Sequence, residues 1–139
     1  MRTSALLLTL TLLSLTGCGE SGPSLTSVSG KVTVDDVPWT KGAVRFVPDK
    51  SKGNTGINEA TGTIGADGSY TLSTVNKSGA PTGWYKVSVS SGEIPDSANA
   101  NAAKTAFPAR YGDPEKSGFL IEVVKSAAPG AYDLKIVSK

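Results

Sequence analysis

The chain contains a single cysteine, Cys18, and no histidine. The absence of histidine removes the usual general base at neutral pH and the commonest metal ligand. Ser-His-Asp and Cys-His catalytic arrangements are therefore excluded. Serine and threonine are plentiful, but no Ser-x-x-Lys pattern stands at the start of an expected helix. Cys18 is thus the one side chain whose type and position point to a specific chemistry, and we expect no catalytic residue.

The acidic residues form no recognisable metal site. Asp35, Asp36, Asp67 and Asp113 fall in expected loops, where oxygen ligands suit calcium. The run that begins at Asp67 lacks carboxylates at the third and fifth positions of a calcium loop and a Glu at the twelfth. Turn-forming aspartate is the simpler interpretation, because Asp hydrogen-bonds to its own backbone in turns. We therefore expect no bound metal and no cofactor.

The residues before Cys18 have the three-part pattern of a secretory signal. Arg2 supplies a positive charge, Ala5 to Leu15 is an eleven-residue run of Leu, Ala, Thr and Ser, and two small residues follow. The run is shorter than the roughly 20 apolar residues that a membrane-spanning helix needs. Residues 1–17 are therefore predicted to be a signal peptide that is removed.

The segment Leu15-Thr16-Gly17-Cys18 resembles the lipobox of bacterial lipoproteins, in which a Leu and two small residues precede an obligatory Cys. The resemblance implies that a dedicated signal peptidase recognises these residues and cuts before Cys18. It also implies a diacylglyceryl thioether on Cys18 and an acylated amine, and two or three chains hold a protein stably on a membrane. Gly19 is not the Asp of the inner-membrane retention signal of enteric bacteria, which favours the outer membrane. A free thiol after an ordinary signal is the alternative.

Residues 18–26 are expected to be the lipidated cysteine and a flexible tether. The run Gly19 to Thr26 is rich in Gly, Ser and Pro and has no periodicity. Eight such residues have a typical reach of about 16 Å and span at most about 26 Å. The folded part is therefore expected to lie close to the membrane surface.

The charge balance gives no reason to expect a nucleic-acid partner. The chain has 14 basic and 12 acidic residues, and removal of residues 1–17 takes away Arg2 alone, which leaves 13 against 12. Phosphate binding needs clustered Lys and Arg, whereas the basic residues here are mostly single.

Residues 27–139 are predicted to form one all-β domain. Short runs alternate between apolar and polar residues and are separated by Gly and Pro turns. About seven strands in some 110 residues are typical of an antiparallel β-sandwich, prealbumin-like or Ig-like. Two of the segments flank Gly65-Ala66-Asp67-Gly68, which predicts a hairpin. The expected strands are 28–34, 43–47, 60–64, 69–74, 84–90, 119–124 and 132–137.

The runs VSGKVTVDDVPWTKGAVRFVPD, TGTIGADGSYTLST and GAPTGWYKVSV resemble small secreted proteins of planctomycete bacteria that carry a carboxypeptidase regulatory-like, transthyretin-like domain. The resemblance extends from Ser27 to the C-terminus and implies a prealbumin-like sandwich. Those proteins often read DGKPL where this chain has Asp36-Val37-Pro38-Trp39. No activity follows from the resemblance, because such domains are accessory modules and a fold does not supply a function.

Two tryptophans and one long loop are the candidates for ligand contact. Trp39 lies in an expected turn, Trp84 shares a strand face with polar residues, and Tyr111 lies in the loop Glu93 to Glu115. Exposed aromatic rings stack on sugars or bind a protein. The competing interpretation is that the loop covers Trp39 or Trp84, with Phe107 and Tyr111 as apolar partners.

These features together predict an exported, lipid-anchored protein of the cell envelope whose domain is a non-catalytic structural or interaction module. Its expected partner is the membrane, through the acyl chains, with an envelope protein or a glycan as a further partner. The alternative is a carbohydrate- or peptide-binding module that uses the aromatic residues and the loop 93–115. A domain that assists a catalytic partner is a third hypothesis.

Overall fold

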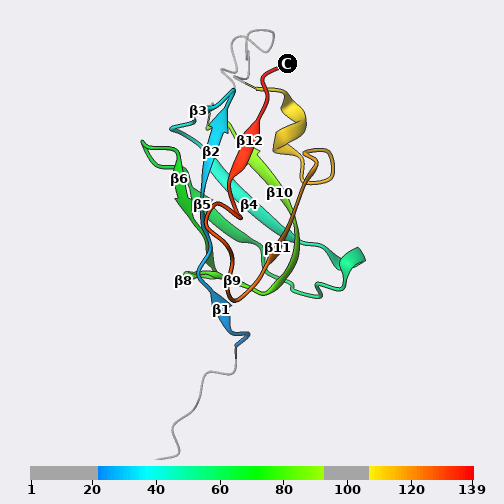
Figure 1. Ribbon diagram of the computed structural model, residues 1–139. Coiled ribbons are helices and arrows are strands. Elements are labelled where there is room, and N and C mark those ends of the chain that lie inside the picture. The colour runs from blue at the N-terminus through cyan, green and yellow to red at the C-terminus, as the bar shows by residue number, and fades with distance from the viewer. Residues whose placement is uncertain (1–21, 93–106) are drawn as a thin grey trace, which may run out of the picture.

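The computed structural model describes residues 22–92 and 107–139, which form a mostly β structure with almost no helix (Figure 1). The all-β prediction is confirmed. Two short 3-10 helices, η1 and η2, interrupt the strands. The elements are β1 Leu25–Thr26, β2 Ser29–Val34, β3 Val37–Pro38, β4 Ala43–Pro48, η1 Lys50–Lys52, β5 Ala60–Thr63, β6 Ser69–Thr71, β7 Ser73–Thr74, β8 Lys77–Ser78, β9 Ala80–Pro81, β10 Gly83–Ser90, η2 Ala109–Gly112, β11 Phe119–Val123 and β12 Leu134–Ile136.

Each of the seven expected segments contains one of the longer strands. The described residues hold twelve strand segments, however, and five of them are only two residues long. The predicted count of about seven strands is therefore not confirmed, because backbone pairing continues into short segments whose side chains do not alternate visibly.

The larger sheet is antiparallel and has the order β11-β10-β4-β5-β7-β8. Its longest strand is β10, which pairs with β4 from Tyr85↔Pro48 to Ser90↔Ala43 and with β11 on its other side. Because β10 and β4 run in opposite directions, the start of β10 lies beside the end of β4. This register decides where the two tryptophans lie.

The second sheet is built around β2 and contains one parallel pair. β12 pairs with β2 in parallel, with Leu134↔Val32 in register, whereas β3 and β6 pair with β2 antiparallel. The prediction of a purely antiparallel arrangement is therefore wrong for the last strand. After β11 the chain crosses to the other sheet and arrives in the direction of β2 (Figure 1).

Side chains from both sheets meet in one core. The alternation expected along the strands is observed in β12, where Leu134 and Ile136 are buried and Lys135 is exposed, but in β10 Ser88 is buried together with Val87 and Val89. Phe46 of β4 is fully buried, and its ring centroid lies 6.4 Å from that of Tyr70 on β6 and 5.8 Å from that of Tyr85 on β10. These three rings link the two sheets.

The hairpin predicted around Gly65 to Gly68 is only half correct. The turn exists, because Gly65 N–H donates to the Ser69 carbonyl oxygen at 2.8 Å. The strands on its two sides nevertheless belong to different sheets, since β5 pairs with β4 and β7 while β6 pairs with β2. The turn therefore carries the chain from one sheet to the other.

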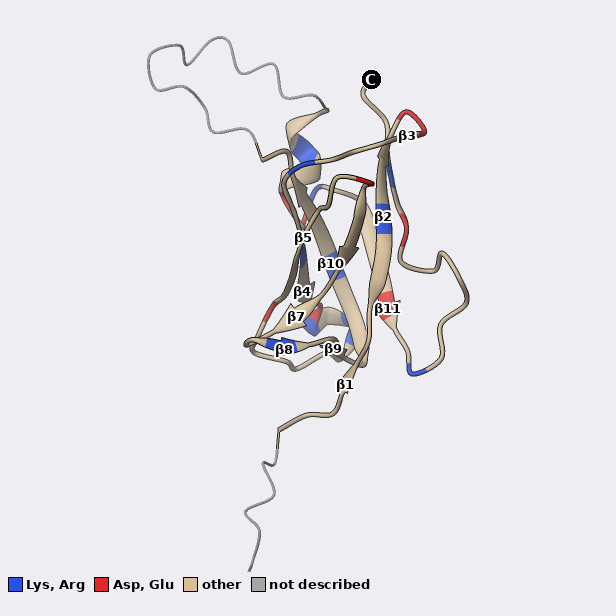
Figure 2. Ribbon diagram, turned by 90° about the vertical axis from the view of Figure 1, so that its left-hand side faces the viewer, with Lys and Arg blue, Asp and Glu red and all other residues tan. Residues whose placement is uncertain are grey.

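The two ends of the fold are clearly distinct. β1, β8 and β9 lie at one end, and β3 and the chain's C-terminus lie at the other (Figures 1 and 2). β1 pairs with β9 through Leu25↔Pro81 and Thr26↔Ala80. Leu25 and Thr26 are thus part of a sheet, and the folded part begins two residues before the expected boundary at residue 27.

The turn between β7 and β8 has an unusual backbone. Val75 has φ 47° and Asn76 has φ 63°, which places both in the left-handed region. Asn and Gly tolerate such angles, but a β-branched residue there is a genuine outlier. The Val75 side chain is nevertheless 66% exposed and therefore has little packing to offset the strain.

We expect Val75→Asn to stabilise the fold by about 1 kcal/mol, because Asn accepts the left-handed conformation that costs other residues about 1–2 kcal/mol. Urea unfolding of the full chain, followed by tryptophan emission, measures the change. Val37→Asn is the control, because Val37 is equally exposed at 65% but has no positive φ. A stability gain in the control as large as that in Val75→Asn would contradict the strain argument.

Candidate functional site

The residues of the expected lipidation motif, Leu15, Thr16, Gly17 and Cys18, lie outside the described residues. So do positions 93–106 of the expected loop. Among residues 22–92 and 107–139, no helix has the length and apolar character needed to cross a membrane. The structure therefore bears on the motif only through the segment that follows it.

That segment is fixed to the domain by β1. Gly79, between β8 and β9, approaches β1 so closely that a Cβ on it would lie 2.5 Å from the Thr26 carbonyl oxygen, and its φ is +103°. The Thr74 hydroxyl donates to the Gly79 carbonyl oxygen at 2.8 Å and holds this corner in place. In the sequence, six residues, 19–24, separate Cys18 from β1.

Trp84 lies at the start of β10, beside the loop that contains η1. Its carbonyl oxygen accepts hydrogen bonds from Asp49 N–H and from the Asn54 amide, both at 2.9 Å. The Lys52 ammonium lies 4.6 Å from the centroid of the indole ring, which is a cation–π distance. Trp84 is half-buried, so part of the ring remains at the surface.

Trp39 lies between β3 and β4 and is covered from one side. The Phe107 ring meets it edge-on with the centroids 5.5 Å apart, and the Lys41 ammonium lies 5.3 Å from its centroid. This contact supports the interpretation that the residues of the long loop cover Trp39. Its indole N–H is buried and has no hydrogen-bond partner among the residues that the structure describes.

Tyr111 is not available as a ligand contact, which corrects the expectation from sequence. The residue is only 5% exposed, and its ring stacks on Phe119 with the centroids 5.5 Å apart. Its hydroxyl oxygen accepts from Val137 N–H at 3.3 Å and from Arg110 at 3.1 Å. The Arg110 hydrogen bond, followed by that from Val137, lowers the pKa of the Tyr111 phenol. Tyr111 thus fastens η2 to β11 and β12.

The three aromatic candidates do not converge on one site. Trp84 stands where β10 begins, beside the end of β4, whereas Trp39 precedes the start of β4, which pairs with the end of β10. The two tryptophans therefore lie at opposite ends of the larger sheet. Sequence alternation could not show this, because it gives the face of a strand but not its register.

Lys86 is the centre of the best-defined group of charges. Its ammonium lies 2.6 Å from a Glu115 carboxylate oxygen and 4.0 Å from the buried Asp49 carboxylate. The Glu115 hydrogen bond raises the pKa of Lys86, and the Ser51 hydroxyl lowers the pKa of Asp49. A lysine held protonated is neither a nucleophile nor a base at neutral pH. The group therefore serves to join η1, β10 and the segment after η2.

Asp67 and Asp113 accept hydrogen bonds within turns, whereas the Asp35 carboxylate binds the distant C-terminal segment. Asp67 accepts from Ser69 N–H at 3.0 Å and from the Ser69 hydroxyl at 2.6 Å, and these bonds lower its pKa. Asp113 accepts from Glu115 N–H at 2.9 Å, and Asp35 accepts from Ser138 near the C-terminus. These carboxylate oxygens therefore accept hydrogen bonds from groups of the protein itself.

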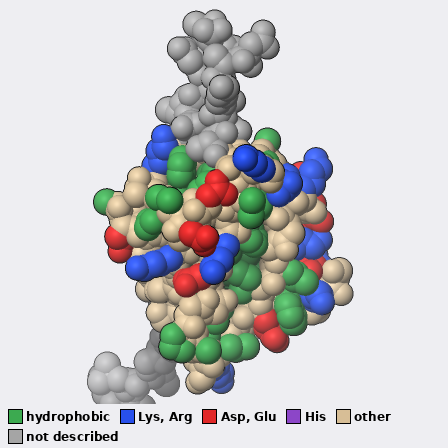
Figure 3. All heavy atoms as spheres, turned by 45° about the horizontal axis from the view of Figure 1, so that its top comes forward, with side chains coloured by type: hydrophobic (Ala, Val, Ile, Leu, Met, Phe, Trp, Pro, Cys, Tyr) green, Lys and Arg blue, Asp and Glu red, His purple; other side chains and the backbone are tan. Residues whose placement is uncertain are grey.

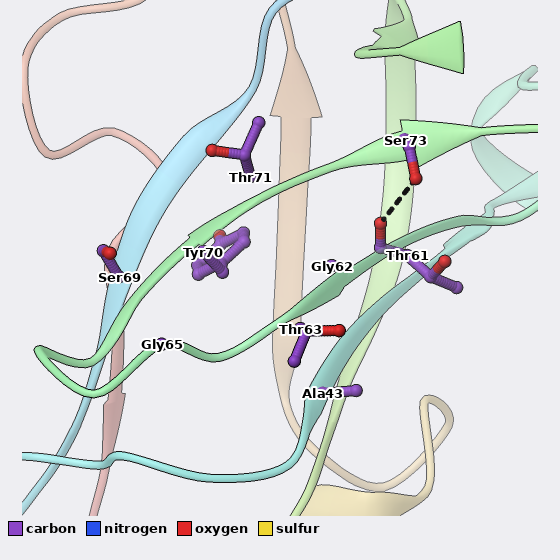
Figure 4. A pocket seen from close by; sticks show the side chains of 9 residues that line it. All are labelled: Ala43, Thr61, Gly62, Thr63, Gly65, Ser69, Tyr70, Thr71 and Ser73. Carbon is purple, nitrogen blue, oxygen red and sulfur yellow. Dashed lines mark hydrogen bonds between the residues drawn. The ribbon is translucent and has the colours of Figure 1, made fainter. Parts of the chain in front are cut away.

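An open groove of about 590 Å³ lies between β5 and the β6–β7 segment (Figure 4). The groove exists because Gly62 has no side chain, and a Cβ there would lie 2.5 Å from the Thr71 carbonyl oxygen. Six hydroxyl groups but no charged side chain line it. The lining residues are Ala43, Thr61, Gly62, Thr63, Gly65, Ser69, Tyr70, Thr71 and Ser73.

One of these hydroxyls has a carboxylate partner, since the Ser69 hydroxyl donates to Asp67 at 2.6 Å, but the lowered pKa of Asp67 makes that carboxylate a weak base. The Ser73 hydroxyl donates to the Thr61 carbonyl oxygen at 3.4 Å, and the hydroxyls of Thr71 and Ser29 lie 3.1 Å apart. The only aromatic ring, that of Tyr70, is 2% exposed, and its hydroxyl donates to the Tyr132 carbonyl oxygen. The groove can bind water or a neutral polar group, but it lacks an aromatic platform for a sugar.

The end of the molecule that is remote from β1 presents mixed charges. Figure 3 shows acidic and basic side chains lying close together on that face. Among the described residues, no group of three or more His, Cys, Asp or Glu side chains could hold a metal ion. Comparisons with family models, with curated proteins and with solved structures found no match to this chain.

Proposed function

We propose that this protein is a membrane-anchored lipoprotein of the cell envelope in which Cys18 carries the acyl chains. The observation that carries the proposal is the sequence Leu15-Thr16-Gly17-Cys18 followed, after only six residues, by a strand fixed to the domain. A tether this short has a typical reach of about 13 Å. The domain is then held against the membrane rather than projected from it. The absence of Asp at position 19 favours the outer membrane.

The domain itself is proposed to be a transthyretin-like β-sandwich that acts as a structural or interaction module. Two sheets that share one core support this proposal, as does the resemblance to planctomycete proteins with a carboxypeptidase regulatory-like domain. A non-catalytic role is supported by the state of the polar groups. Lys86 is held protonated by Glu115, and the carboxylate that accepts from a groove hydroxyl, Asp67, has a lowered pKa and is a weak base.

The test of the anchor is Cys18→Ser in the full chain, expressed in a bacterium that processes lipoproteins. We expect incorporation of radiolabelled palmitate to fall to background and the protein to move from the membrane fraction to the soluble fraction, because every acyl chain depends on the Cys18 thioether and the amine freed beside it. Ser24→Ala in the tether is the control and should keep both label and membrane association. Label retained by Cys18→Ser would remove the basis of the proposal.

A carbohydrate- or peptide-binding module is the alternative function. The buried indole N–H of Trp39, which lacks an acceptor among the described residues, is the observation that favours it. A ligand carbonyl or hydroxyl oxygen could accept that hydrogen bond. Titration of the protein with a glycan and peptide panel, followed by tryptophan emission, tests this alternative. Emission that no ligand changes would count against it.

A further inference from the structure

We propose that the end of the domain from which the N-terminal chain emerges is a membrane-contact face that rests on anionic lipid headgroups. The exit face, as we name it, consists of the apolar side chains of Ile57 and Val75 and the ammonium groups of Lys50, Lys52 and Lys77. The β7–β8 turn and the loop after η1 lie at the same end of the domain as β1 (Figure 1), and Pro23 lines one hollow with Ile57 and Thr74. This inference rests on the proposed acylation of Cys18, which would bring the exit face to the bilayer.

The first support is the placement of exposed apolar side chains. Ile57 is 89% exposed, the highest value among the described large hydrophobic residues, and Val75 is 66% exposed, a value that Val37 at the opposite end matches at 65%. Ile57 and Val75 belong to the same end, because Ile57, Pro23 and Thr74, the neighbour of Val75, line one hollow of about 410 Å³. Side chains of this kind, surrounded by lysine, are typical of proteins that lie in the membrane interface.

The second support is the distribution of charge. The segments that make up this end, 22–26, 49–59, 74–82 and 124–131, contain four lysines against two acids, and one of these acids, Asp49, is buried and bonded to Ser51. The other acid, Glu59, lies 3.5 Å from Arg45. The opposite end, segments 34–42, 64–68, 107–112 and 137–139, contains three acids against three basic residues, and Glu115 is paired with Lys86 beside Asp49. The end with the excess of positive charge is therefore the one from which the N-terminal chain leaves the domain.

The third support is the length of the free chain. Six residues, 19–24, separate Cys18 from β1 and span at most about 21 Å. Because β1 lies among β8, β9 and the loop after η1, the exit face stays within that distance of the anchored cysteine. A protein partner on this face would have to displace the bilayer, whereas a partner at the opposite end would not. The membrane is therefore the favoured occupant.

The backbone at Val75 agrees with this assignment. A valine in the left-handed conformation is less favourable than Asn or Gly, and Val75 does not gain core packing in return. Strain that persists without a structural benefit is typical of functional positions. At the tip of the β7–β8 turn, the apolar side chain would reach the lipid surface.

Two tryptophans at opposite ends make the orientation measurable. The full chain, acylated at Cys18, is reconstituted in vesicles of phosphatidylglycerol with phosphatidylcholine brominated high on its acyl chains. In Trp39→Phe the emission comes from Trp84 near the exit face, and in Trp84→Phe it comes from Trp39 at the other end. We expect brominated lipid to quench Trp84 at least several-fold more strongly than Trp39, and replacement of phosphatidylglycerol by phosphatidylcholine to weaken the quenching of Trp84.

Matched variants separate the contribution of the lysine charges from that of the apolar side chains of the exit face. Lys50→Gln with Lys77→Gln should lower the ratio of docked to undocked protein about 30-fold on anionic vesicles, and Lys116→Gln with Lys139→Gln, outside the exit face, should leave it unchanged. Ile57→Asn with Val75→Asn should also weaken the quenching of Trp84, whereas Val37→Asn should not. Since Val75→Asn relieves strain, a weakened contact could not be attributed to a damaged turn.

The outcomes distinguish the two proposals. Acylated protein that stays on the vesicles while Trp84 and Trp39 are quenched equally overturns the exit face and leaves the anchor intact. Protein that carries no acyl chain on Cys18 overturns both. Quenching of Trp39 alone would place the opposite end on the membrane, which contradicts the exit face directly.

Discussion

Phe46→Ala is expected to destabilise the protein by about 3–5 kcal/mol, the range found for the loss of a large aromatic side chain from a packed core. Phe46 is fully buried on β4 and lies between Tyr70 of the second sheet and Tyr85 of β10. Its removal would leave a cavity where the two sheets meet. Because small domains are stable by only about 5–15 kcal/mol, the variant should be close to unfolding at 37 °C.

Urea unfolding of the full chain, monitored by circular dichroism and tryptophan emission, measures this effect. Ile57→Ala is the matched control, since it also deletes a large apolar side chain but at a position that is 89% exposed. We expect that control to change the free energy of unfolding by less than about 0.5 kcal/mol. Equal losses in the two variants would show that Phe46 does not join the sheets.

The strands that bury one face were predictable because a period of two is visible in the sequence. Val32 on β2, Val87 on β10 and Leu134 on β12 alternate with polar residues and are buried as expected. Alternation reports which face of a strand is covered, and the covered faces here all belong to one core. The all-β class followed from that pattern alone.

The pairing of the strands was not predictable in the same way. The turn at Gly65 to Gly68 indicates a hairpin, but Val32 N–H donates to the Gly68 carbonyl oxygen at 2.9 Å and draws the following strand to β2. The parallel arrival of β12 is a similar case. In both cases the outcome depends on which distant strand pairs with the backbone of β2. The local spacing of residues carries no information about that choice.

The candidate functional residues were likewise predictable from sequence only in part. Cys18 could be identified from sequence because its chemistry is encoded in four consecutive residues. The exit face could not, since Lys50 and Ile57 come from the β4–β5 connection and Val75 from the β7–β8 turn, which only the fold brings to one end of the domain. Val75 in particular occupies a turn position that usually holds Asn or Gly, and a valine at that position does not indicate a turn.

Gly42→Ala is expected to cost about 3 kcal/mol or more, because backbone strain and a steric clash act together. Gly42 has φ +94°, and a Cβ on it would lie 1.9 Å from the Ser90 carbonyl oxygen and 3.0 Å from Gly92 N. Ser90 pairs with Ala43 at the end of β10, so the oxygen cannot retreat without opening the β4–β10 register. The Gly42 carbonyl oxygen also accepts from Ile64 N–H at 3.0 Å, which holds the end of β5 in place.

Gly118→Ala separates the two causes. Gly118 has a similar φ of +79° but nothing lies within 4 Å of a Cβ placed on it, so this variant should cost only about 1–2 kcal/mol, from backbone strain alone. The difference between the two variants in the free energy of urea unfolding then measures the clash with Ser90. Equal losses of stability in Gly42→Ala and Gly118→Ala would contradict this argument. The left-handed backbone that both positions share would then account for the whole effect, and the close approach of Gly42 to Ser90 would not constrain the fold.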